Sequence, residues 1–342
     1  MSELRHDPIQ RRWVIIATER GLNPTHFHMD KESSSEAFCP FCEGNEDKTP
    51  KEIYAVRQPE STADGPGWRV RVLPNKFPAL RIEGDLERKG VGYYDNMRGI
   101  GAHEVVVETP FHNEDWADMS VANISKIMQA YTLRIQDLCN DSRFRYILVF
   151  KNYGKGAGAS LSHAHSQIIA LPVTPINVAV ELNSAKEHYH LKERCLFCDI
   201  LQYEIQSGDR IIRMNERFVA YAPYASRFPF ETWISPRYHS YDFAQSSATD
   251  LTYLAEILKD IVMRLNRSLN QPPYSFVLHN TPNIRGEKKR INWWETIRYD
   301  WHWHIELTPK ITPIAGFEWG TGIYINPVAP EKAAKYLREV EI

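Results

Sequence analysis

The chain has 342 residues, of which 43% are hydrophobic and 25% are charged, and its formal net charge is −2. This composition is typical of a globular protein with one large or two ordinary domains, and the charge gives no reason to expect a nucleic acid or an anionic membrane as partner. No apolar stretch approaches the roughly 20 residues that cross a bilayer, and the N-terminus lacks the apolar core of a signal peptide. We therefore expect a cytoplasmic enzyme or binding protein.

Four of the five cysteines form two similar C-x-x-C pairs. Cys39 and Cys42 lie in "FCPFCEG", and Cys195 and Cys198 lie in "RCLFCDI". In a cytosolic protein such a pair is a zinc half-site or a redox pair more often than a structural disulfide. The βαβ context of a thioredoxin-like redox motif is absent, so zinc is favoured, and each pair then needs two more ligands. Cys139 lies alone in a helical pattern and is interpreted as a small buried residue.

The first half of the chain shows a strand, a helix and a second strand in that order. An apolar alternating run ends at His112 in "HEVVVETPFHN". Apolar residues at helical spacing then predict a helix over 121–138, with Ser120 as its cap. The run "YILVFKN" predicts a buried strand ending at Asn152, and "HAHSQIIALP" follows it.

The second half repeats this order. A strand-like run ends at His239, a helix is predicted over 249–265 with Thr249 as its cap, and "YSFVLHN" ends at Asn280 before "HWHIELTP". His112 and Asn152 are 40 residues apart, and His239 and Asn280 are 41 apart. We therefore predict an α+β protein of two tandem units, each an antiparallel sheet with a long helix, which form a pseudo-dimer. The expected domains are 1–178 and 179–342.

The repeat also supplies the missing zinc ligands. In an H-x-H strand both side chains face the same way, so one histidine can bind metal while its neighbour acts elsewhere. The alternative is that His112 and His239 are surface residues at strand ends, but their matched places after two C-x-x-C pairs favour ligation. The predicted sets are Cys39, Cys42, His112 and either His163 or His165, and Cys195, Cys198, His239 and either His302 or His304.

The two halves differ around the H-x-H pair. Gly154, Gly156 and Gly158 precede the first pair, and such a loop lets backbone N–H groups approach an anion closely. Gln167, an amide donor, follows the first pair, whereas Glu306, which would repel phosphate, follows the second. We therefore predict that the first half is catalytic, with Gly158 among its substrate-binding residues, and that the second is a structural or docking copy. Alternatively, the glycines only make a tight turn.

A glycine loop, a histidine on a strand and a nearby amide suit phosphoryl chemistry. A neutral imidazole attacks phosphorus if one ring nitrogen is held as N–H by an acceptor and the other keeps its lone pair. The product, a nucleotidyl-histidine, would be the intermediate of a two-step, ping-pong transfer. Loop N–H groups, Ser160 and Gln167 would stabilise charge on the non-bridging oxygens.

Five segments together resemble the galactose-1-phosphate uridylyltransferase family, a branch of the histidine-triad superfamily: "CPFC", "NKFPAL", "VFKNYGKGAGASLSHAHSQ", "PFETWISPRYH" and "GFEWGTGIYINP". The resemblance runs from about Arg5 to Ala334. It implies that His165 carries the uridylyl group and that His163 binds zinc with Cys39, Cys42 and His112. The substrate-binding residues that it implies are Arg20, Asn75, Lys76, Phe77, Asn152, Ser160, Gln167, Gly316, Phe317 and Glu318.

Three positions depart from the family pattern: Lys76 stands where an acidic residue is common, Asn23 replaces a second arginine and Thr312 replaces a lysine. In the family, the stretch that matches Gly316 to Glu318 reaches the neighbouring subunit's site, so the resemblance implies a homodimer with shared active sites.

The second metal site varies among members of this family. Some use a glutamate with three histidines, and the residues that match that version are Glu181, His279 and His304. Because this chain has the second C-x-x-C pair, we favour Cys195, Cys198, His239 and His302, with zinc or iron as the ion.

Three functions follow from the residues and the resemblance. The first is uridylyl exchange, in which UDP-glucose and galactose 1-phosphate give glucose 1-phosphate and UDP-galactose. The second is a phosphorylase-type reaction in which inorganic phosphate takes the nucleotidyl group of ADP-glucose. The third is nucleotide binding without turnover, which His165 argues against because a binder needs no nucleophile there.

Overall fold

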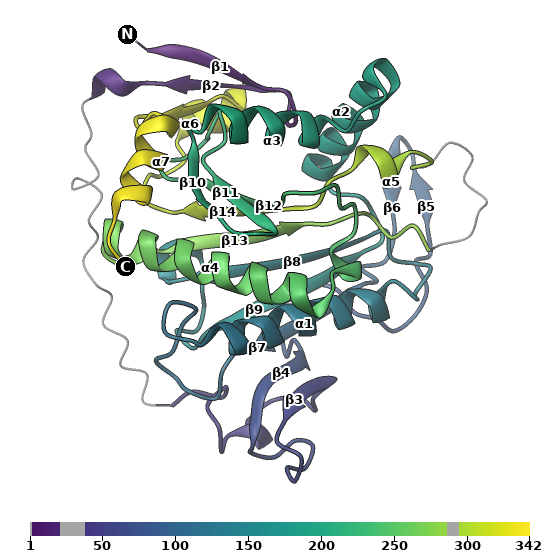
Figure 1. The fold of residues 1–342 in the computed structure, drawn as a ribbon. Helices are drawn as coiled ribbons and strands as arrows, with labels where there is room; N and C mark the ends of the chain where they lie inside the picture. The colour runs from purple at the N-terminus through teal and green to yellow at the C-terminus, as the bar shows by residue number, and fades with distance from the viewer. Residues whose placement is uncertain (1, 21–37, 286–293) are drawn as a thin grey trace.

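The structure is a computed structural model that describes residues 2–20, 38–285 and 294–342. A sheet of ten antiparallel strands forms its centre (Figure 1). The order across the sheet is β10-β11-β12-β14-β13-β8-β9-β7-β4-β3. The strands span Tyr54–Arg57 (β3), Trp68–Pro74 (β4), Ala102–Val107 (β7), Tyr146–Tyr153 (β8), His165–Leu171 (β9), Ile211–Met214 (β10), Phe218–Tyr221 (β11), Thr232–Pro236 (β12), Tyr274–His279 (β13) and His304–Pro309 (β14).

The two halves of the sheet have the same strand order. From its outer edge inward the first half runs β3, β4, β7, β9, β8, and the second half runs β10, β11, β12, β14, β13. In each half, therefore, the strand that carries the H-x-H motif lies between the third and fourth strands of that half in chain order. The halves join where β8 pairs with β13, with Tyr153 opposite Tyr274 and Val149 opposite Leu278.

Two long helices, α1 (Val121–Leu138) and α4 (Ala248–Leu269), lie side by side on one face of the sheet and cover the main core (Figure 1). Ser120 caps α1, as predicted, because its side chain accepts the Asn123 N–H. The prediction that Thr249 caps the second helix is wrong. Ser247 is the cap, and it forms a capping box with Asp250, so the helix begins at Ala248.

The opposite face carries α2 (Ile176–Lys192), α3 (Leu196–Ser207) and the short α5 (Ile297–Asp300). Strand residues alternate between the two faces, as period-two geometry requires. Phe218 and Ala220 of β11 belong to the main core, whereas Val219 and Tyr221 pack in the cluster that includes residues of α2 and α3. The α+β class with antiparallel pairing that the sequence predicts is confirmed.

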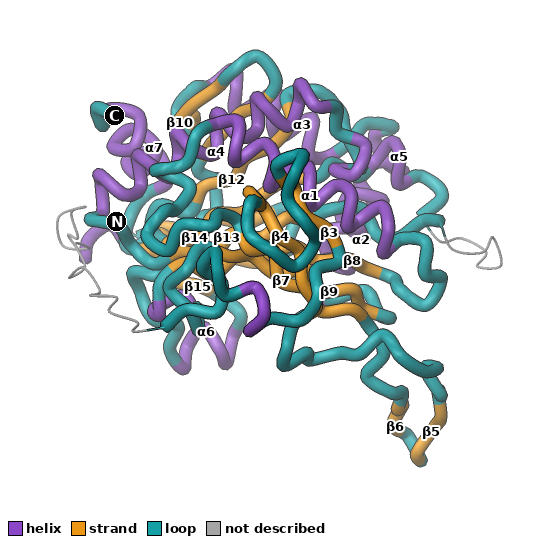
Figure 2. Tube along the Cα trace, turned by 90° about the horizontal axis from the view of Figure 1, so that it is seen from below, coloured by secondary structure: helices purple, strands orange, loops and turns teal. Residues whose placement is uncertain are grey.

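Two small sheets complete the fold. The hairpin of β1 (Glu3–Asp7) and β2 (Arg12–Ile16) is extended by β15 (Tyr324–Asn326), which pairs in parallel with β2 and so joins an N-terminal segment to a C-terminal one. The hairpin of β5 (Lys89–Val91) and β6 (Tyr94–Asn96) projects from the body (Figure 2). The remaining helices are α6 (Gly316–Thr321), beside β15, and α7 (Pro330–Glu339), which packs on α4 and β10. Among the described residues, every helix is too short or too polar to span a bilayer.

Candidate functional site

The four residues predicted to form the first zinc site come together. The ligand atoms of Cys39, Cys42, His112 and His163 all lie within 4.8 Å of one another. Nδ1 of His163 is 3.5 Å from Cys39 Sγ and 3.7 Å from Cys42 Sγ, and Nδ1 of His112 is 3.5 Å from Cys42 Sγ. Tetrahedral zinc with ordinary Zn–S and Zn–N bonds separates a sulfur from a nitrogen ligand by about 3.6 Å. The donor set and its spacing therefore fit zinc.

The tautomer of His163 also suits a metal ligand. Its Nε2–H donates to the Thr109 carbonyl at 2.7 Å, which leaves the Nδ1 lone pair directed at the two cysteines. Burial lowers the pKa of His163 to about 4, so the ring is neutral at physiological pH. Of the alternatives left open by the sequence, His163 rather than His165 lies with the cysteines.

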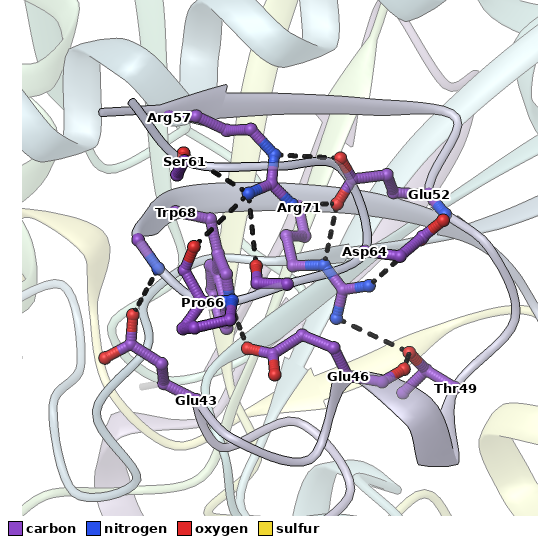
Figure 3. Close-up of polar contacts among 12 residues, drawn as sticks. Glu43, Glu46, Thr49, Glu52, Arg57, Ser61, Asp64, Pro66, Trp68 and Arg71 are labelled. Carbon is purple, nitrogen blue, oxygen red and sulfur yellow. Dashed lines mark hydrogen bonds and ion pairs between the residues drawn. The ribbon is translucent and has the colours of Figure 1, made fainter. Parts of the chain in front are cut away.

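A polar network fixes the chain that follows Cys42 (Figure 3). Trp68 Nε1 donates to Glu46 at 2.7 Å, and Arg71 Nε donates to Glu52 at 3.1 Å. Both donors belong to β4, so the segment after the C-x-x-C pair is bound to the edge of the sheet. Because Arg71 is only 1% exposed, water cannot replace this bond easily, and the network holds the cysteine loop in place.

The second cluster repeats this geometry with Cys195, Cys198, His239 and His302, whose ligand atoms again lie within 4.8 Å of one another. Nδ1 of His239 and Nδ1 of His302 are each 3.4 Å from Cys198 Sγ. Their Nε2 atoms donate to the carbonyls of Arg298 and Pro236, at 2.9 and 3.1 Å. A hydrogen bond from Cys195 lowers the pKa of Cys198, and the two histidines add to this effect, so Cys198 loses its proton more readily than Cys195.

Glu181, His279 and His304, the alternative ligands, form a third and separate group with Glu306, and all four are buried. His279 Nδ1 lies 3.0 Å from Glu181. Burial alone would lower the pKa of His279, but the charges of Glu181 and Glu306 raise it to about 9, so this histidine is an imidazolium in an ion pair. Arg227 bonds to Glu306. Arg227 is shared with Glu231, and among the described residues His304 Nε2 and Glu306 Oε1 are buried without a hydrogen-bond partner.

His165 is the first residue of β9 and shares one face of the strand with Gln167, because strand side chains alternate, whereas His163 lies two residues before the strand begins. Its Nδ1 lies 2.8 Å from the His163 carbonyl and donates to it, so Nε2 keeps its lone pair. Burial lowers the pKa of His165 below its usual value, which keeps the ring neutral. This is the orientation that a nucleophilic imidazole needs.

The glycine loop differs from its prediction. The N–H groups of Ala157, Gly158 and Ala159 donate to carbonyls of Gly154 and Lys155 inside the loop, so these three amides are not directed at an anion. The loop lies against Pro273, where a Cβ on Gly156 would approach Pro273 Cγ to 2.9 Å. The tight-turn interpretation therefore holds for Gly154 and Gly156.

The side-chain amides of Asn152 and Gln167, both predicted to contact the phosphate, have their oxygens occupied. Ser275 Oγ donates to Asn152 Oδ1 at 3.2 Å, and Gln167 Oε1 is 2.7 Å from His103 Nε2. With both oxygens occupied, the NH2 groups of Asn152 and Gln167 are left to donate. Gly158 has φ +90°, a conformation that favours glycine. A Cβ added at this position would lie 3.8 Å from Asn152 Nδ2. Ser160 lies in an exposed part of the same loop.

The remaining predicted residues whose side chains are described lie at least partly on the surface. Asn75, Lys76 and Phe77 follow β4, and Phe77 is 82% exposed. Phe317 is half exposed, and Glu318 accepts the Ala315 N–H at 3.1 Å and so caps the helix α6 to which Gly316 also belongs. Arg20 ends a short 3-10 helix (Thr18–Arg20), and its side chain, like Asn23, lies outside what the structure describes.

One contact residue was missed by the sequence analysis. His103, in β7, touches Gln167 and also the segment after β4 through Asn75 and Ala79. The only signal in the sequence was a polar residue at the start of the apolar run "HEVVVETP".

Comparison with known proteins identifies the family to which the chain belongs. Residues 1–175 match the N-terminal domain of galactose-1-phosphate uridyl transferase, and residues 146–341 match its C-terminal domain. ADP-glucose phosphorylase of Arabidopsis thaliana is 35% identical over 99% of this chain and 93% of its own length. Galactose-1-phosphate uridylyltransferase of Thermotoga maritima is 29% identical over 100% of this chain and 99% of its own.

Solved structures agree with this result. The crystal structure of the Arabidopsis ADP-glucose phosphorylase with bound ADP-glucose has a TM-score of 0.83 at 34% identity and covers 100% of both chains. A structure described as uridylyltransferase has a TM-score of 0.74 at 28% identity, over 99% of this chain and 97% of that one. Fold and site thus define a nucleotidyltransferase. The chain belongs to the galactose-1-phosphate uridyl transferase family.

Proposed function

We propose that this protein transfers a nucleotidyl group from a nucleotide sugar to a second phosphate-bearing acceptor through a covalent bond to His165. The observation that carries the proposal is the orientation of that ring, with Nδ1–H bonded to the His163 carbonyl at 2.8 Å and Nε2 unprotonated. A neutral imidazole held in this way is a competent nucleophile.

In the first step the Nε2 lone pair attacks the α-phosphorus of the donor. The P–N bond forms, the phosphoanhydride bond breaks, and sugar 1-phosphate leaves with the electron pair. In the second step an oxygen of the acceptor attacks the same phosphorus, and the P–N bond breaks to return neutral His165. The His163 carbonyl, which accepts Nδ1–H, stabilises the positive charge on the ring in the intermediate.

The amides of Asn152 and Gln167, together with the Ser160 hydroxyl, are assigned to the non-bridging phosphate oxygens. Their support is the orientation of the two amides, whose oxygens already accept from Ser275 and His103. Hydrogen bonds to a charged oxygen in a partly buried site are among the larger contributions to catalysis. Gly158 lies beside Asn152, where a Cβ would be 3.8 Å from Nδ2.

We assign Zn2+ to Cys39, Cys42, His112 and His163, and a second Zn2+ or iron ion to Cys195, Cys198, His239 and His302. When bound, the first ion cross-links the cysteine loop to the chain that enters β9. The protein residues then keep His163 fixed, and with it the carbonyl that orients His165. A reducing cytoplasmic compartment suits the free thiols of the cysteines, all of which lie in the described residues.

Two substrate pairs fit this chemistry. The family name supports UDP-glucose with galactose 1-phosphate. ADP-glucose with inorganic phosphate is the second candidate, and one observation favours it: the relative that bears the name ADP-glucose phosphorylase has the higher sequence identity. In either case Asn75, Lys76, Phe77 and Arg20 are assigned to the nucleoside.

We also propose that residues 1–178 and 179–342 are two histidine-triad-like units that form a pseudo-dimer. The matching strand order of the two half-sheets supports this division. Gly316, Phe317 and Glu318 are assigned to the sugar end of a neighbouring subunit's site, which requires a homodimer. The exposure of Phe317 at the molecular surface is consistent with such a role.

The test uses donors labelled with 32P at the α-phosphate, UDP-glucose and ADP-glucose, each with the pure protein and no acceptor. We expect one donor to label the wild-type protein and H165A to take no label, with a loss of turnover of about 10³-fold or more. H190A, which changes an exposed histidine, is the matched control. Release of the label by galactose 1-phosphate or by phosphate identifies the acceptor. Retained labelling of H165A would move the nucleophile elsewhere.

A further inference from the structure

His103 lies between the catalytic amide and the segment assigned to the nucleoside. It is half-buried in β7, where it pairs with Ile169 of β9, while Val105 pairs with Gln167. His103 and Gln167 are therefore diagonal neighbours on one face of the sheet, a separation that long side chains can span. On its other side the chain of residues 75–79 passes over the ring, with the Asn75 N–H bonded to the His103 carbonyl at 2.8 Å.

The backbone decides the tautomer of His103. The Ala79 N–H donates to Nδ1 at 3.1 Å, and a backbone N–H cannot act as an acceptor. Nδ1 is therefore unprotonated, and the proton of the neutral ring is on Nε2. That N–H donates to Gln167 Oε1 at 2.7 Å. The Asn75 side-chain nitrogen is 3.0 Å from the same Nε2, and since a protonated nitrogen cannot accept, this contact is a close approach only.

The orientation of Gln167 follows from this tautomer. Because Nε2–H needs an acceptor, the amide oxygen must point at His103 and the NH2 group must point away from it. The reverse orientation would leave Nε2–H without an acceptor, because the Asn75 amide, whose oxygen accepts the Phe77 N–H, presents only its nitrogen to the ring. We propose that His103 is a positioning residue that turns the Gln167 amide so that it donates to the α-phosphate, and that it anchors residues 75–79 through its other ring nitrogen.

One imidazole thereby links the two ends of the donor: the phosphate through Gln167 and the nucleoside through the segment that contains Asn75 and Phe77. The inference rests on the proposed function for its catalytic consequence. Its structural part, the Nε2–H tautomer and the bond from Ala79, stands on the contacts alone.

Two conservative variants separate the two contacts. H103N keeps an acceptor near the position of Nδ1 but has no donor at the position of Nε2. We expect it to slow labelling of His165 about tenfold, on the scale of one net hydrogen bond, and to change the donor KM little. H103Q keeps a donor near the position of Nε2 and loses the acceptor for Ala79. We expect it to label at nearly the wild-type rate and to raise the donor KM by up to about tenfold.

A double-mutant cycle shows whether His103 acts through Gln167. In a Q167A background, H103N should have no further effect on the labelling rate, because the amide that it orients is gone. Wild-type rate and KM in both single variants, or an equal loss from H103N with and without Gln167, would overturn the inference. Thermal unfolding of each variant checks that the fold is intact.

The outcome is distinguishable from failure of the proposed function. If neither donor labels the wild-type protein, the proposed function fails, and two measurements without substrate decide the inference. The 15N spectrum of the His103 ring should show protonated Nε2, and H103L should speed hydrogen exchange of the Ala79 amide. A ring protonated at Nδ1, or exchange that is unchanged in H103L, would overturn it.

Discussion

Replacing Lys151 with methionine should destabilise the protein strongly, because it leaves a buried charge without a partner. Lys151 forms an ion pair with Glu108, and their side chains are 1% and 0% exposed. Without the ammonium, water cannot reach the Glu108 carboxylate, and within the described part of the chain only the Tyr131 hydroxyl, at 3.3 Å, still donates to it. Breaking a buried pair from one side costs about 3–5 kcal/mol, and the remaining Tyr131 contact favours the lower end, about 3 kcal/mol.

The control for this prediction removes both charges. K151M/E108M replaces the pair with apolar side chains of similar volume, and such replacements are often neutral, so the double variant should recover most of the loss. The measurement is urea unfolding of the three proteins under identical metal content. A loss below about 1 kcal/mol for K151M, or a double variant less stable than K151M, would refute the reasoning that burial makes the single change costly.

Three further predictions concern the pH dependence, the metal content and a helix cap. Since burial lowers the pKa of His165, the neutral nucleophile persists below pH 6.5, and the single-turnover labelling rate should begin to fall only at lower pH; a rate that is already halved above pH 6.5 would contradict this. C42S should lose one of two bound metal ions by elemental analysis, whereas C139S, which changes a thiol outside the clusters, should keep both; equal content in C42S would exclude ligation. S247A should lower the free energy of unfolding by about 1 kcal/mol and T249A by much less, because the Ser247 side chain, and not that of Thr249, accepts a backbone N–H of the first turn; equal losses would contradict this assignment.

The two metal clusters could be predicted because the same pattern of cysteines and histidines occurs in both halves of the sequence. Cys39 and Cys42 need two more donors, and the second half of the chain shows the same need with the same spacing, so His112 and His239 stand out together. The choice of His163 over His165 could not be made from spacing alone. It depends on which ring faces the sulfur atoms, which the Thr109 carbonyl decides.

The predictions for the cap of α4 and for the glycine loop were wrong for different reasons. The cap could be predicted from the sequence, because Ser247 and Asp250 have capping-box spacing, whereas the residue three positions after Thr249 is Thr252, which is not acidic. The direction of the N–H groups in the glycine loop could not be predicted from the sequence. Whether the Gly158 N–H points outward or bonds to Lys155 depends on the path of the turn, and glycine permits both.

His103 could not be found by a local pattern either. Its two partners are 64 and 24 residues away and meet it only through the register of β7 with β9 and the path of the chain after β4. A polar residue at the start of an apolar strand has no distinctive signature by itself. Only the contacts that His103 makes in the folded protein, with Gln167 and Ala79, indicate its role.

The pairing of β8 with β13 has a consequence for the chain as a whole. Each of these strands has one neighbour from its own half and one from the other half, so either half alone would present a long bare edge of peptide groups. Such an edge attracts any free strand, including that of a second molecule. Because the two halves belong to one polypeptide, the matching edge is always close by, and it covers the bare edge before that edge can pair with another molecule and cause aggregation.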